Sequence, residues 1–229
     1  MTEEKQYIPK CIGIILDGNR RFATQQGLPK LEGHRRGFDN VEPIVLAARD
    51  LGIAHMAVYA FSTENWNRSA EEVAYLMDLF ITMAQTQFKR LKKEHVAVRF
   101  VGQRWRFSQK MQDLMQKIEV DAPQSPKLTL WVCLSYGGRA EIVHAANELA
   151  MRGETITEES LGKHLWTADM PDPDIIIRTS GEHRLSNFLL WKSAYSELFF
   201  PKVFWPAFTK KDLEAVLEEY AQRERRMGK

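Results

Sequence analysis

Short apolar runs alternate with longer amphipathic stretches along this chain, and this alternation constrains the fold more than any other feature. The short runs are rich in β-branched and other apolar residues, which is typical of buried strands. Strands are predicted at residues 11–16, 54–61, 96–101, 128–134 and 174–177. Helices are predicted between and after them, at residues 19–26, 36–51, 70–93, 109–120, 139–151, 158–166 and 210–225. Such alternation predicts an α/β fold with a mainly parallel sheet covered on both faces.

Pro43 lies inside the predicted helix 36–51. Because proline lacks a backbone N–H and clashes with the preceding turn, it should kink this helix or mark a later start. The length of 229 residues suits one large domain with a continuous core. We therefore expect a single domain over residues 1–229, in which about residues 1–9 form a flexible N-terminus.

Charge and cysteine content exclude several classes of protein. Lys and Arg total 32 against 30 Asp and Glu, a balance that argues against non-specific nucleic-acid binding and predicts no nucleic-acid partner. Cys11 and Cys133 lie in apolar runs, which favours buried, reduced thiols over a disulfide framework. The first residues are polar and acidic, unlike a signal peptide, and no apolar run is long enough to span a bilayer. A cytoplasmic protein is expected, compatible with a transient peripheral membrane contact.

Common catalytic signatures are absent from the sequence. It contains no G-x-G-x-x-G, Walker A, H-E-x-x-H, C-x-x-C or G-x-S-x-G motif, which disfavours nucleotide cofactors and acyl transfer. Polar segments instead follow the predicted strands, at the edge where open α/β sheets bind ligands. The first of them, residues 17–22 (DGNRRF), combines an acid, a glycine turn and two arginines at a helix start. It could hold a phosphate or a metal and diphosphate pair. Alternatively, Asp17 only caps the helix and both arginines are solvated.

Two further polar segments follow later strands. Residues 61–68 (FSTENWNR) form a loop dense in hydrogen-bonding groups, and the local role expected of Glu72 is to complete a Ser69 helix cap. Residues 178–186 (RTSGEHRLS) place two arginines beside hydroxyl groups, a second candidate anion clamp. Glu197 lies in an aromatic stretch, where a metal or an arginine must neutralise it. On the residues alone, His34 and Arg139 are expected to be structural.

Several motifs together resemble the cis-prenyltransferase family. They are residues 17–22, 33–37 (GHRRG), 61–68, 178–182 (RTSGE), 184–191 (RLSNFLLW) and 195–199 (YSELF), and the likeness extends over residues 9–228, including 136–139 (YGGR) and 223–226 (RERR). The resemblance implies a single domain with a central, mainly parallel six-stranded sheet flanked by helices, and an apolar tunnel between the sheet and the helices. It also implies a homodimer.

The resemblance implies a transferase that condenses isopentenyl diphosphate with an allylic diphosphate, farnesyl diphosphate being the expected primer. The product would be a long-chain Z-polyprenyl diphosphate, namely undecaprenyl diphosphate for the cell-wall (peptidoglycan) carrier lipid. By family likeness, Mg²⁺ is bound by Asp17 and, across a dimer contact, by Glu197. The expected catalytic residues are Asp17 and Asn65. The expected substrate-binding residues are Gly18, Asn19, Arg20, Arg21, Phe22, Lys30, His34, Ser62, Thr63, Glu64, Trp66, Arg68, Arg178, Arg184, Leu185 and Ser186.

Within this assignment, the family pattern implies specific roles. The allylic diphosphate would lie on residues 18–21 with Lys30 and His34 nearby, and isopentenyl diphosphate on Arg178, Arg184 and Ser186. Phe22 and Trp66 would contact the allylic chain, while Arg68 and Glu72 would order a closing loop. The group that accepts the proton is left open. The family pattern points to Asn65 with Ser62 and His34, but an amide is a poor base, so diphosphate itself is the alternative acceptor.

Some positions depart from the commonest family pattern: Lys30 replaces an arginine, Phe22 a tryptophan and Ser135 an asparagine. The alternatives are a short-chain or irregular Z-prenyl synthase, a non-catalytic partner subunit and an unrelated phosphate-binding α/β module. Small Ala60 near the tunnel floor favours a long product, whereas Trp131 would shorten the tunnel if it pointed inward. The strand-end acid and both arginines of the clamp disfavour the non-catalytic subunit.

Overall fold

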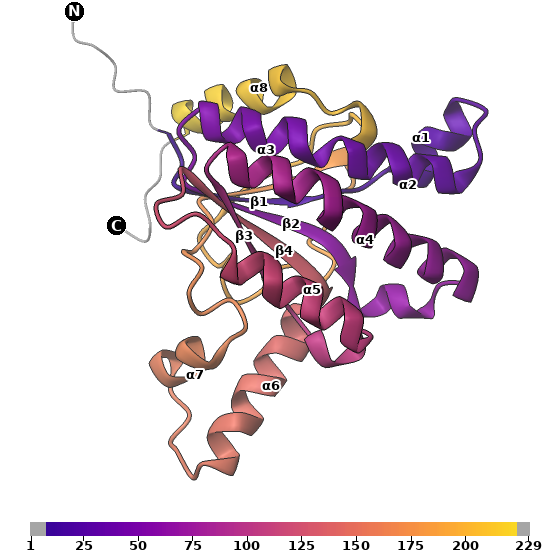
Figure 1. Cartoon of the computed structure of the whole chain (residues 1–229). Coiled ribbons are helices and arrows are strands. Elements are labelled where there is room, and N and C mark those ends of the chain that lie inside the picture. Colours follow the sequence, from indigo (N-terminus) through magenta and orange to yellow (C-terminus); the bar gives the residue numbers. More distant parts are fainter. Residues whose placement is uncertain (1–7, 224–229) are drawn as a thin grey trace, which may run out of the picture.

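A central six-stranded sheet organises the computed structural model, which describes residues 8–223 (Figure 1). Its strand order is β3-β4-β2-β1-β5-β6, and every pairing between neighbours is parallel. The strands are β1 (Cys11–Ile15), β2 (His55–Ser62), β3 (Val96–Val101), β4 (Leu128–Tyr136), β5 (Ile175–Arg178) and β6 (Glu197–Phe199). The predicted α/β architecture is confirmed, and β6 supplies the sixth strand.

Helices connect the strands as the sequence pattern predicts. They are α1 (Asn19–Gln25), α2 (Lys30–Asp39), α3 (Val41–Asp50), α4 (Ala70–Lys93), α5 (Gln109–Val120), α6 (Gly138–Met151), α7 (Glu158–His164) and α8 (Lys210–Gln222). Four short 3₁₀ helices lie at strand ends or in loops: η1 (Thr63–Asn67), η2 (Arg104–Arg106), η3 (Thr179–Gly181) and η4 (Trp205–Ala207). Helices α4 and α5 have the predicted bounds, and most other predicted ends differ by one or two residues.

The predicted helix 36–51 is wrong as one element. The structure divides this region into α2 and α3, which meet at Asn40. Pro43 is the third residue of α3, where its missing N–H costs no helical hydrogen bond, so the later start is the correct alternative. The side chain of Asn40 donates hydrogen bonds to the carbonyl oxygens of Trp205 and Phe208, at 2.8 and 2.9 Å. The region thus forms two helices because Pro43 favours a new helix start and because the Asn40 side chain is hydrogen-bonded to distant backbone at the junction.

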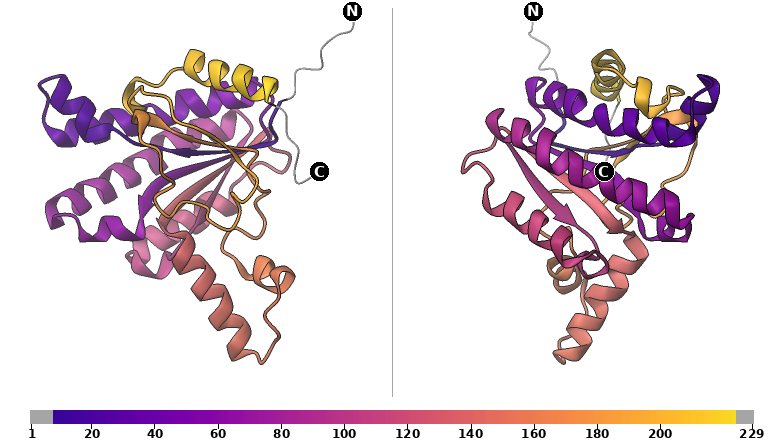
Figure 2. Two further views of the ribbon diagram at one scale, coloured as in Figure 1. Left: turned by 180° about the vertical axis from the view of Figure 1, so that it is seen from behind. Right: turned by 45° about the vertical axis from the view of Figure 1, so that its right-hand side comes forward.

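The two faces of the sheet are covered differently. On one face, alternate residues of β1 and β2, such as Ile14 and Val58, join a large core with α3, α4, α5 and α8. On the other, β2 and β4 side chains such as Tyr59 and Trp131 contact irregular chain around Met170 and Phe188. Figure 2 shows α6 and α7 extending away from the sheet, with a small core of their own. The helical face is therefore where a cavity between sheet and helices can form.

Two predictions concern chain ends. Residues 1–7 lie outside the described residues, so the flexible N-terminus predicted over about residues 1–9 stays a prediction. Residues 224–226 of the RERR motif and the last residues of the predicted helix 210–225 also lie outside them. Within residues 8–223, no helix combines the length and the apolar character that crossing a membrane requires.

Candidate active site

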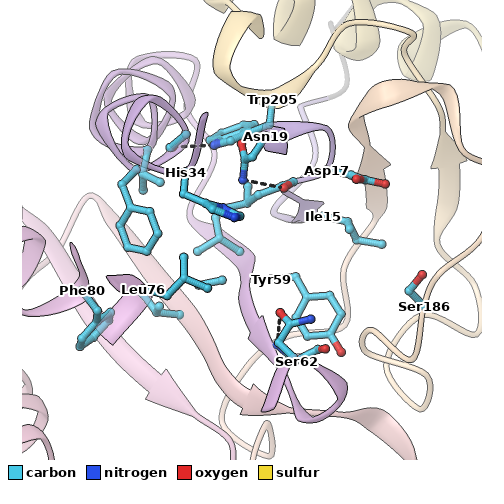
Figure 3. Close-up of a pocket in the computed structure, with 18 of the residues that line it drawn as sticks. Ile15, Asp17, Asn19, His34, Tyr59, Ser62, Leu76, Phe80, Ser186 and Trp205 are labelled. Atoms are coloured by element: carbon cyan, nitrogen blue, oxygen red, sulfur yellow. Dashed lines mark hydrogen bonds between the residues drawn. The ribbon is translucent and has the colours of Figure 1, made fainter. Parts of the chain in front are cut away.

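A cavity of about 540 Å³ opens at the carboxyl ends of β1, β2 and β5. Because all strands are parallel, the polar segments predicted from the sequence meet at this one edge. The predicted site residues that line the cavity are Asp17, Asn19, His34, Ser62, Glu64, Asn65, Arg68, Arg178 and Ser186. Figure 3 shows Asp17 and Ser186 at one end of the cavity, and Leu76 and Phe80 at the other. The cavity thus has a polar mouth and an apolar interior.

Asp17 is fixed at the mouth by the pairing of β1 with β5. Ile15 lies beside Arg178 in this register, which brings the guanidinium group to the carboxylate two residues further on. Asp17 Oδ2 accepts hydrogen bonds from Arg178 Nη2 and Nε at 2.7 and 3.1 Å. The hydroxyl of Thr179 accepts from the Asp17 N–H at 3.0 Å and donates to its carbonyl at 2.7 Å. The carboxylate is therefore held by side chain and backbone together.

The alternative that Asp17 only caps a helix is wrong. Helix α1 has Gly18 at its N-cap, with no side-chain cap, and Gly18 has a φ of 102°, a conformation that only glycine adopts readily. Arg21 is not simply solvated either, since its Nη2 donates to Ser180 Oγ at 2.7 Å and lies 3.3 Å from Asp17 Oδ1. The glycine turn thus frees the carboxylate of Asp17 to face the two arginines.

The electrostatic environment keeps Asp17 ionised. Burial by itself raises the pKa of this carboxyl group, but hydrogen bonds and charge from Arg178, followed by the charge of Arg21, outweigh burial. The pKa of Asp17 therefore lies below its ordinary value of 3.8. A permanently charged carboxylate beside two arginines is suited to a divalent cation and to phosphate groups.

The second arginine clamp forms around Arg178, which is only 5% exposed. Its Nη1 donates to Ser186 Oγ and to the Arg184 carbonyl oxygen, both at 2.6 Å. Glu182 bridges two further arginines, accepting from Arg184 Nη1 at 2.6 Å and from Arg21 Nη1 at 2.7 Å. Hydrogen bonds from Arg184 and then Arg21 hold the pKa of Glu182 below its ordinary value. Asp17, Arg21, Arg178, Glu182 and Arg184 are hereafter the Asp17 cluster.

A second set of charges surrounds Glu72 at the start of α4. Its carboxylate contacts Arg68 Nη1 at 2.9 Å, His34 Nε2 at 3.0 Å and Arg20 Nη1 at 3.6 Å. The hydroxyl of Ser69 accepts from the Glu72 N–H, so the predicted helix cap exists. The carboxylate itself, however, points to the two arginines and the imidazole and does not return to the cap. Arg20, His34, Arg68 and Glu72 are hereafter the Glu72 cluster.

His34 is a buried histidine that also lies in the wall of the cavity. It is 5% exposed, lines the cavity and lies on α2. Burial, followed by the charge of Arg68, lowers the pKa of His34, and this effect exceeds the opposing contribution of Glu72. The imidazole is therefore neutral at pH 7, with Nε2 beside the Glu72 carboxylate.

Asn65 and its neighbours lie in η1, directly after β2. Asn65 Oδ1 accepts a hydrogen bond from the Ser62 N–H at 3.2 Å, and a capping box joins the two residues. Glu64 Oε1 accepts from Asn187 Nδ2 at 2.8 Å, and the Thr63 hydroxyl donates to Glu64 Oε2 at 3.1 Å. These bonds orient the polar side of η1 toward the cavity.

Other predicted site residues do not line the cavity. Trp66 donates from Nε1 to Ser135 Oγ at 2.8 Å, and its ring lies under the Arg106 guanidinium. Phe22 lies under the guanidinium of Arg36. Lys30, at the first position of α2, is exposed. Leu185 is half-buried against the core on the other face of the sheet. The contacts predicted between Phe22 or Trp66 and the allylic chain stay a prediction, and neither residue lines this cavity.

Glu197 lies far from Asp17 within one chain. It is the first residue of β6 and pairs with Ile175 at the amino end of β5, whereas Asp17 follows the carboxyl end of β1. Its neutralising partner is Arg223, whose Nη1 lies 2.7 Å from Glu197 Oε2. Within residues 8–223, no three His, Cys, Asp or Glu side chains converge as a metal site. Glu197 therefore does not join Asp17 at the mouth within one chain.

The interior of the cavity agrees with the predicted apolar tunnel between sheet and helices. Val58, Ala60 and Val132 line it from the strands, and Leu76, Phe80 and Met83 line it from α4. Trp131 belongs to the opposite face of the sheet, where its Nε1 donates to His55 Nδ1 at 3.3 Å. Trp131 therefore does not shorten the tunnel.

Sequence reasoning missed Asn187 and the role of Glu182. Asn187 lines the cavity, binds Glu64 and accepts from the Arg139 N–H at 2.9 Å, so it links η1 to the start of α6. Ser186 and Asn187 have φ values of 47° and 68°, a strained conformation that often marks functional sites. In the sequence, the signal that could have indicated Asn187 was its place next to Ser186, the last residue of the predicted anion clamp 178–186.

Comparisons with known proteins agree with this site. A family model described as putative undecaprenyl diphosphate synthase matches residues 15–228. The chain is 45% identical over 226 residues to an isoprenyl transferase of Thermotoga maritima, covering 96% of this chain and 97% of the relative. It is 42% identical over 227 residues to one of Neisseria gonorrhoeae, covering 99% and 92%.

Solved structures share the whole fold. Lavandulyl diphosphate synthase from Lavandula x intermedia, in complex with dimethylallyl diphosphate, superposes with a TM-score of 0.92 at 32% identity, covering 97% of this chain and 99% of that one. A probable undecaprenyl diphosphate synthase from Campylobacter jejuni superposes with a TM-score of 0.82 at 27% identity, covering 96% and 99%. From the family model, the relatives and the site together, the chain belongs to the prenyltransferase family of enzymes that elongate isoprenoid chains in cis.

Proposed function

We propose that this enzyme condenses isopentenyl diphosphate with an allylic diphosphate, with farnesyl diphosphate as primer, to give a long-chain Z-polyprenyl diphosphate. The product we propose is undecaprenyl diphosphate, for use as a cell-wall carrier lipid. The observation that supports this function best is the cationic mouth on an apolar cavity of about 540 Å³. Such a site suits a substrate with an anionic head and a hydrocarbon tail.

Two diphosphates require two anion sites, and the mouth offers two groups of cations. Isopentenyl diphosphate is assigned to Arg178, Arg184 and Ser186, and the allylic diphosphate to residues 18–21 with His34 nearby. Glu182 now lies between Arg21 and Arg184, at 2.7 and 2.6 Å from their nitrogens. A carboxylate in this position supports the assignment, because guanidinium groups that hold a carboxylate also hold phosphate oxygens.

The residues present fit Mg²⁺, which we propose as cofactor. Asp17 is ionised and lies beside the proposed diphosphates, and Mg²⁺ commonly binds through one or two carboxylates together with substrate phosphates. Glu197 of a second copy is the other ligand that we propose. When bound, the ion supplies charge neutralisation to the departing diphosphate.

In the proposed reaction, the double bond of isopentenyl diphosphate attacks C1 of the allylic substrate. The C1–O bond breaks, inorganic diphosphate leaves, and the condensed cation loses a proton to form the Z double bond. Arg20 and Arg21, in the site proposed for the allylic diphosphate, stabilise the negative charge that develops on the leaving oxygen. Asn65 is a poor base because its oxygen already accepts from Ser62, so the departing diphosphate is the acceptor that we propose, with His34 as the nearby neutral base.

A homodimer is part of the proposal. Strand β6 is an edge strand of the sheet, and Tyr195 just before it is 79% exposed. An unpaired edge beside an exposed aromatic side chain suits contact with a second copy. We further propose a cytoplasmic enzyme that contacts the membrane transiently to release its product and has no nucleic-acid partner. Sedimentation velocity of the full chain tests the dimer, and a monomer at micromolar concentration would contradict it.

The experiment that tests the function is incubation with farnesyl diphosphate, labelled isopentenyl diphosphate and Mg²⁺, followed by chain-length analysis. Asp17→Ala is the inactive control, and Asp39→Ala is an exposed acidic control on α2. Undecaprenyl products that require Asp17 and Mg²⁺ are expected. No condensation product with farnesyl, geranyl or dimethylallyl diphosphate would leave the non-catalytic partner subunit as the better reading.

A second candidate, a short-chain or irregular Z-prenyl synthase, is favoured by one observation. The TM-score of 0.92 is to lavandulyl diphosphate synthase bound to dimethylallyl diphosphate. The same assay separates the two candidates when dimethylallyl diphosphate is supplied alone or with isopentenyl diphosphate. Condensation of two dimethylallyl units, or products that stop after one addition, would favour the second candidate.

A further inference from the structure

Three chain segments meet at the cavity mouth, and each comes from the end of a different strand. Residues 63–67 (η1) follow β2, residues 137–139 follow β4, and the anion clamp 178–186 begins at the end of β5. Strand β1 lies between β2 and β5 in the sheet, so strand pairing does not join η1 to the clamp directly. Contacts beyond the sheet therefore set the distance between these two segments.

Asn187, directly after the clamp, makes these contacts. Its Nδ2 donates to Glu64 Oε1 in η1 at 2.8 Å, and its Oδ1 accepts from the Arg139 N–H at 2.9 Å. Its carbonyl oxygen accepts from the Gly138 N–H at 2.7 Å. Both polar atoms of the side-chain amide are thus engaged, which fixes its direction. One residue thereby joins all three segments.

The junction around Asn187 is closely packed. A Cβ atom at Gly137 would lie 2.6 Å from Thr63 Oγ1 and 2.7 Å from Asn187 Nδ2, too close for any side chain. Asn187 has a φ of 68°, in the left-handed region that asparagine adopts more readily than most residues. Ser186 beside it has a φ of 47° and accepts from Arg178 Nη1 at 2.6 Å. The same turn therefore holds the clamp hydroxyl and the amide of Asn187.

The hydrogen bond from Asn187 to Glu64 is charge-assisted. Burial by itself raises the pKa of Glu64, but the hydrogen bond from Asn187 and others from adjacent residues outweigh burial, so the pKa lies below its ordinary 4.5. The carboxylate is therefore ionised at pH 7, and bonds to ionised groups are stronger than those between neutral ones. Segment η1 also carries Asn65, and Arg68 directly after it contacts Glu72 at 2.9 Å. The bond thus links the clamp to the residues around the proposed allylic site.

We propose that Asn187 is a positioning residue: through Glu64 it fixes η1 against the anion clamp, and so sets how the two substrates face each other. This inference rests on the proposed function, because the substrates are those assigned above. Asn187 holds neither diphosphate in that assignment, so its loss should leave the binding of each substrate nearly intact. Condensation, however, needs both reactants in a narrow range of distance and direction, and a displacement of about 1 Å can cost about 10²-fold in rate.

The test reverses the hydrogen bond in the full-length enzyme. Asn187→Asp keeps the shape of the side chain and the bond from the Arg139 N–H, but sets two carboxylates against each other. We expect kcat to fall by about 10²-fold while the KM of each substrate changes little. Ser186→Ala, in the clamp itself, should instead raise the KM for isopentenyl diphosphate.

Two double variants identify the bond as the cause. Asn187→Asp with Glu64→Gln restores the bond with donor and acceptor exchanged, and should return kcat to near that of Glu64→Gln alone, which still offers Asn187 an acceptor. Asn187→Asp with Glu64→Ala has the same net charge but no such bond, and should stay as slow as Asn187→Asp. Equal kcat in the two double variants, or a loss in Asn187→Asp seen only as a higher KM for isopentenyl diphosphate, would overturn the inference.

A second readout does not depend on turnover: hydrogen–deuterium exchange of the backbone amides of residues 62–68. Exchange should be faster in Asn187→Asp and in its pair with Glu64→Ala, and should return to the wild-type rate in its pair with Glu64→Gln. Exchange in α8 should be the same in all variants, which reports an intact fold. Absence of condensation product from the wild type would refute the proposed function alone, whereas unchanged exchange of residues 62–68 in every variant would refute the role of Asn187.

Discussion

The Asp17 cluster and the Glu72 cluster stand on the same cavity mouth, yet they are built differently. The Asp17 cluster grows from adjacent strand ends, and its central guanidinium, that of Arg178, is almost fully buried. The Glu72 cluster joins α1, α2 and α4 through a single carboxylate, and the side chain of Arg20 in it is 54% exposed. Rigid strand ends fix geometry more closely than helices joined by a shared charge. We infer that the first cluster serves the chemistry and the second closes the site around it.

The largest effect is expected from Asp17→Asn. The variant keeps the shape of the side chain but removes its charge, so Arg178 loses its ionic partner and the proposed cation its ligand. We expect kcat/KM to fall by about 10³-fold or more, on the order of 4 kcal/mol of transition-state stabilisation. Steady-state kinetics with saturating Mg²⁺ measure it, with Asp39→Asn as control. A loss below tenfold would mean that the Asp17 cluster is not the reacting centre.

Arg178→Lys should have the next largest effect. Lysine keeps the positive charge but cannot donate from two planar nitrogens to Asp17 Oδ2 while also reaching Ser186. We expect a loss of about 10²-fold in kcat/KM, or ~3 kcal/mol, seen mainly as a higher KM for isopentenyl diphosphate. Arg49→Lys, in an ion pair on α3, is the control. Equal effects in both variants would indicate a loss of stability and not of a clamp.

Glu72→Gln tests the other cluster. Its carboxylate is 15% exposed and contacts two arginines and the neutral His34, but Arg20 is well solvated and the proposed substrate would compensate Arg68. We expect roughly a tenfold or smaller loss, about 1 kcal/mol, in kcat/KM for the allylic substrate. Glu42→Gln is closely matched, since Glu42 is 16% exposed and pairs with Arg90. A loss as large as that of Asp17→Asn would remove the distinction between the two clusters.

The smallest effect concerns pH, and the two clusters should respond in different ranges. The pKa of His34 lies below its ordinary 6.5, mainly because of burial, so the unfolded chain takes up this proton first as the pH falls below 6.5. Stability contributed by His34 is therefore present above pH 6.5 and lost below it. The lowered pKa of Asp17 preserves its contribution above pH 3.8, to be lost only as the pH falls through the folded-state value.

Urea unfolding at pH 7 and pH 5 checks this expectation. The wild-type midpoint should fall more between these pH values than that of His34→Gln, because only in the wild type does unfolding release a buried neutral imidazole that then takes up a proton. Asp17→Asn should keep the wild-type difference, since Asp17 stays ionised over this range. The same change of midpoint with pH in wild type and in His34→Gln would contradict the contribution of His34 to the pH dependence of stability.

How far the sequence predicts this molecule depends on how local the cause is. The predicted bounds of α4 are correct because its apolar periodicity and Ser69 cap are encoded within the segment. The helix break before Pro43 was predicted only as one of two outcomes, since its position depends on the distant carbonyl groups that Asn40 binds. Likewise, the cap role of Asp17 was a fair local alternative, and only the neighbouring strand that carries Arg178 overturns it.

The sequence by itself determined the alternation of strands and helices, the polar strand ends and the family, because each is written in contiguous residues. Tertiary structure decided which charges meet, since Glu72 could serve its own cap or reach His34 and Arg68 on other elements. It also decided that Trp131 points away from the cavity, and that three phenylalanines from α4 and β3 pack against one another. Side-chain direction and partner choice depend on strand register and packing, which no single segment encodes.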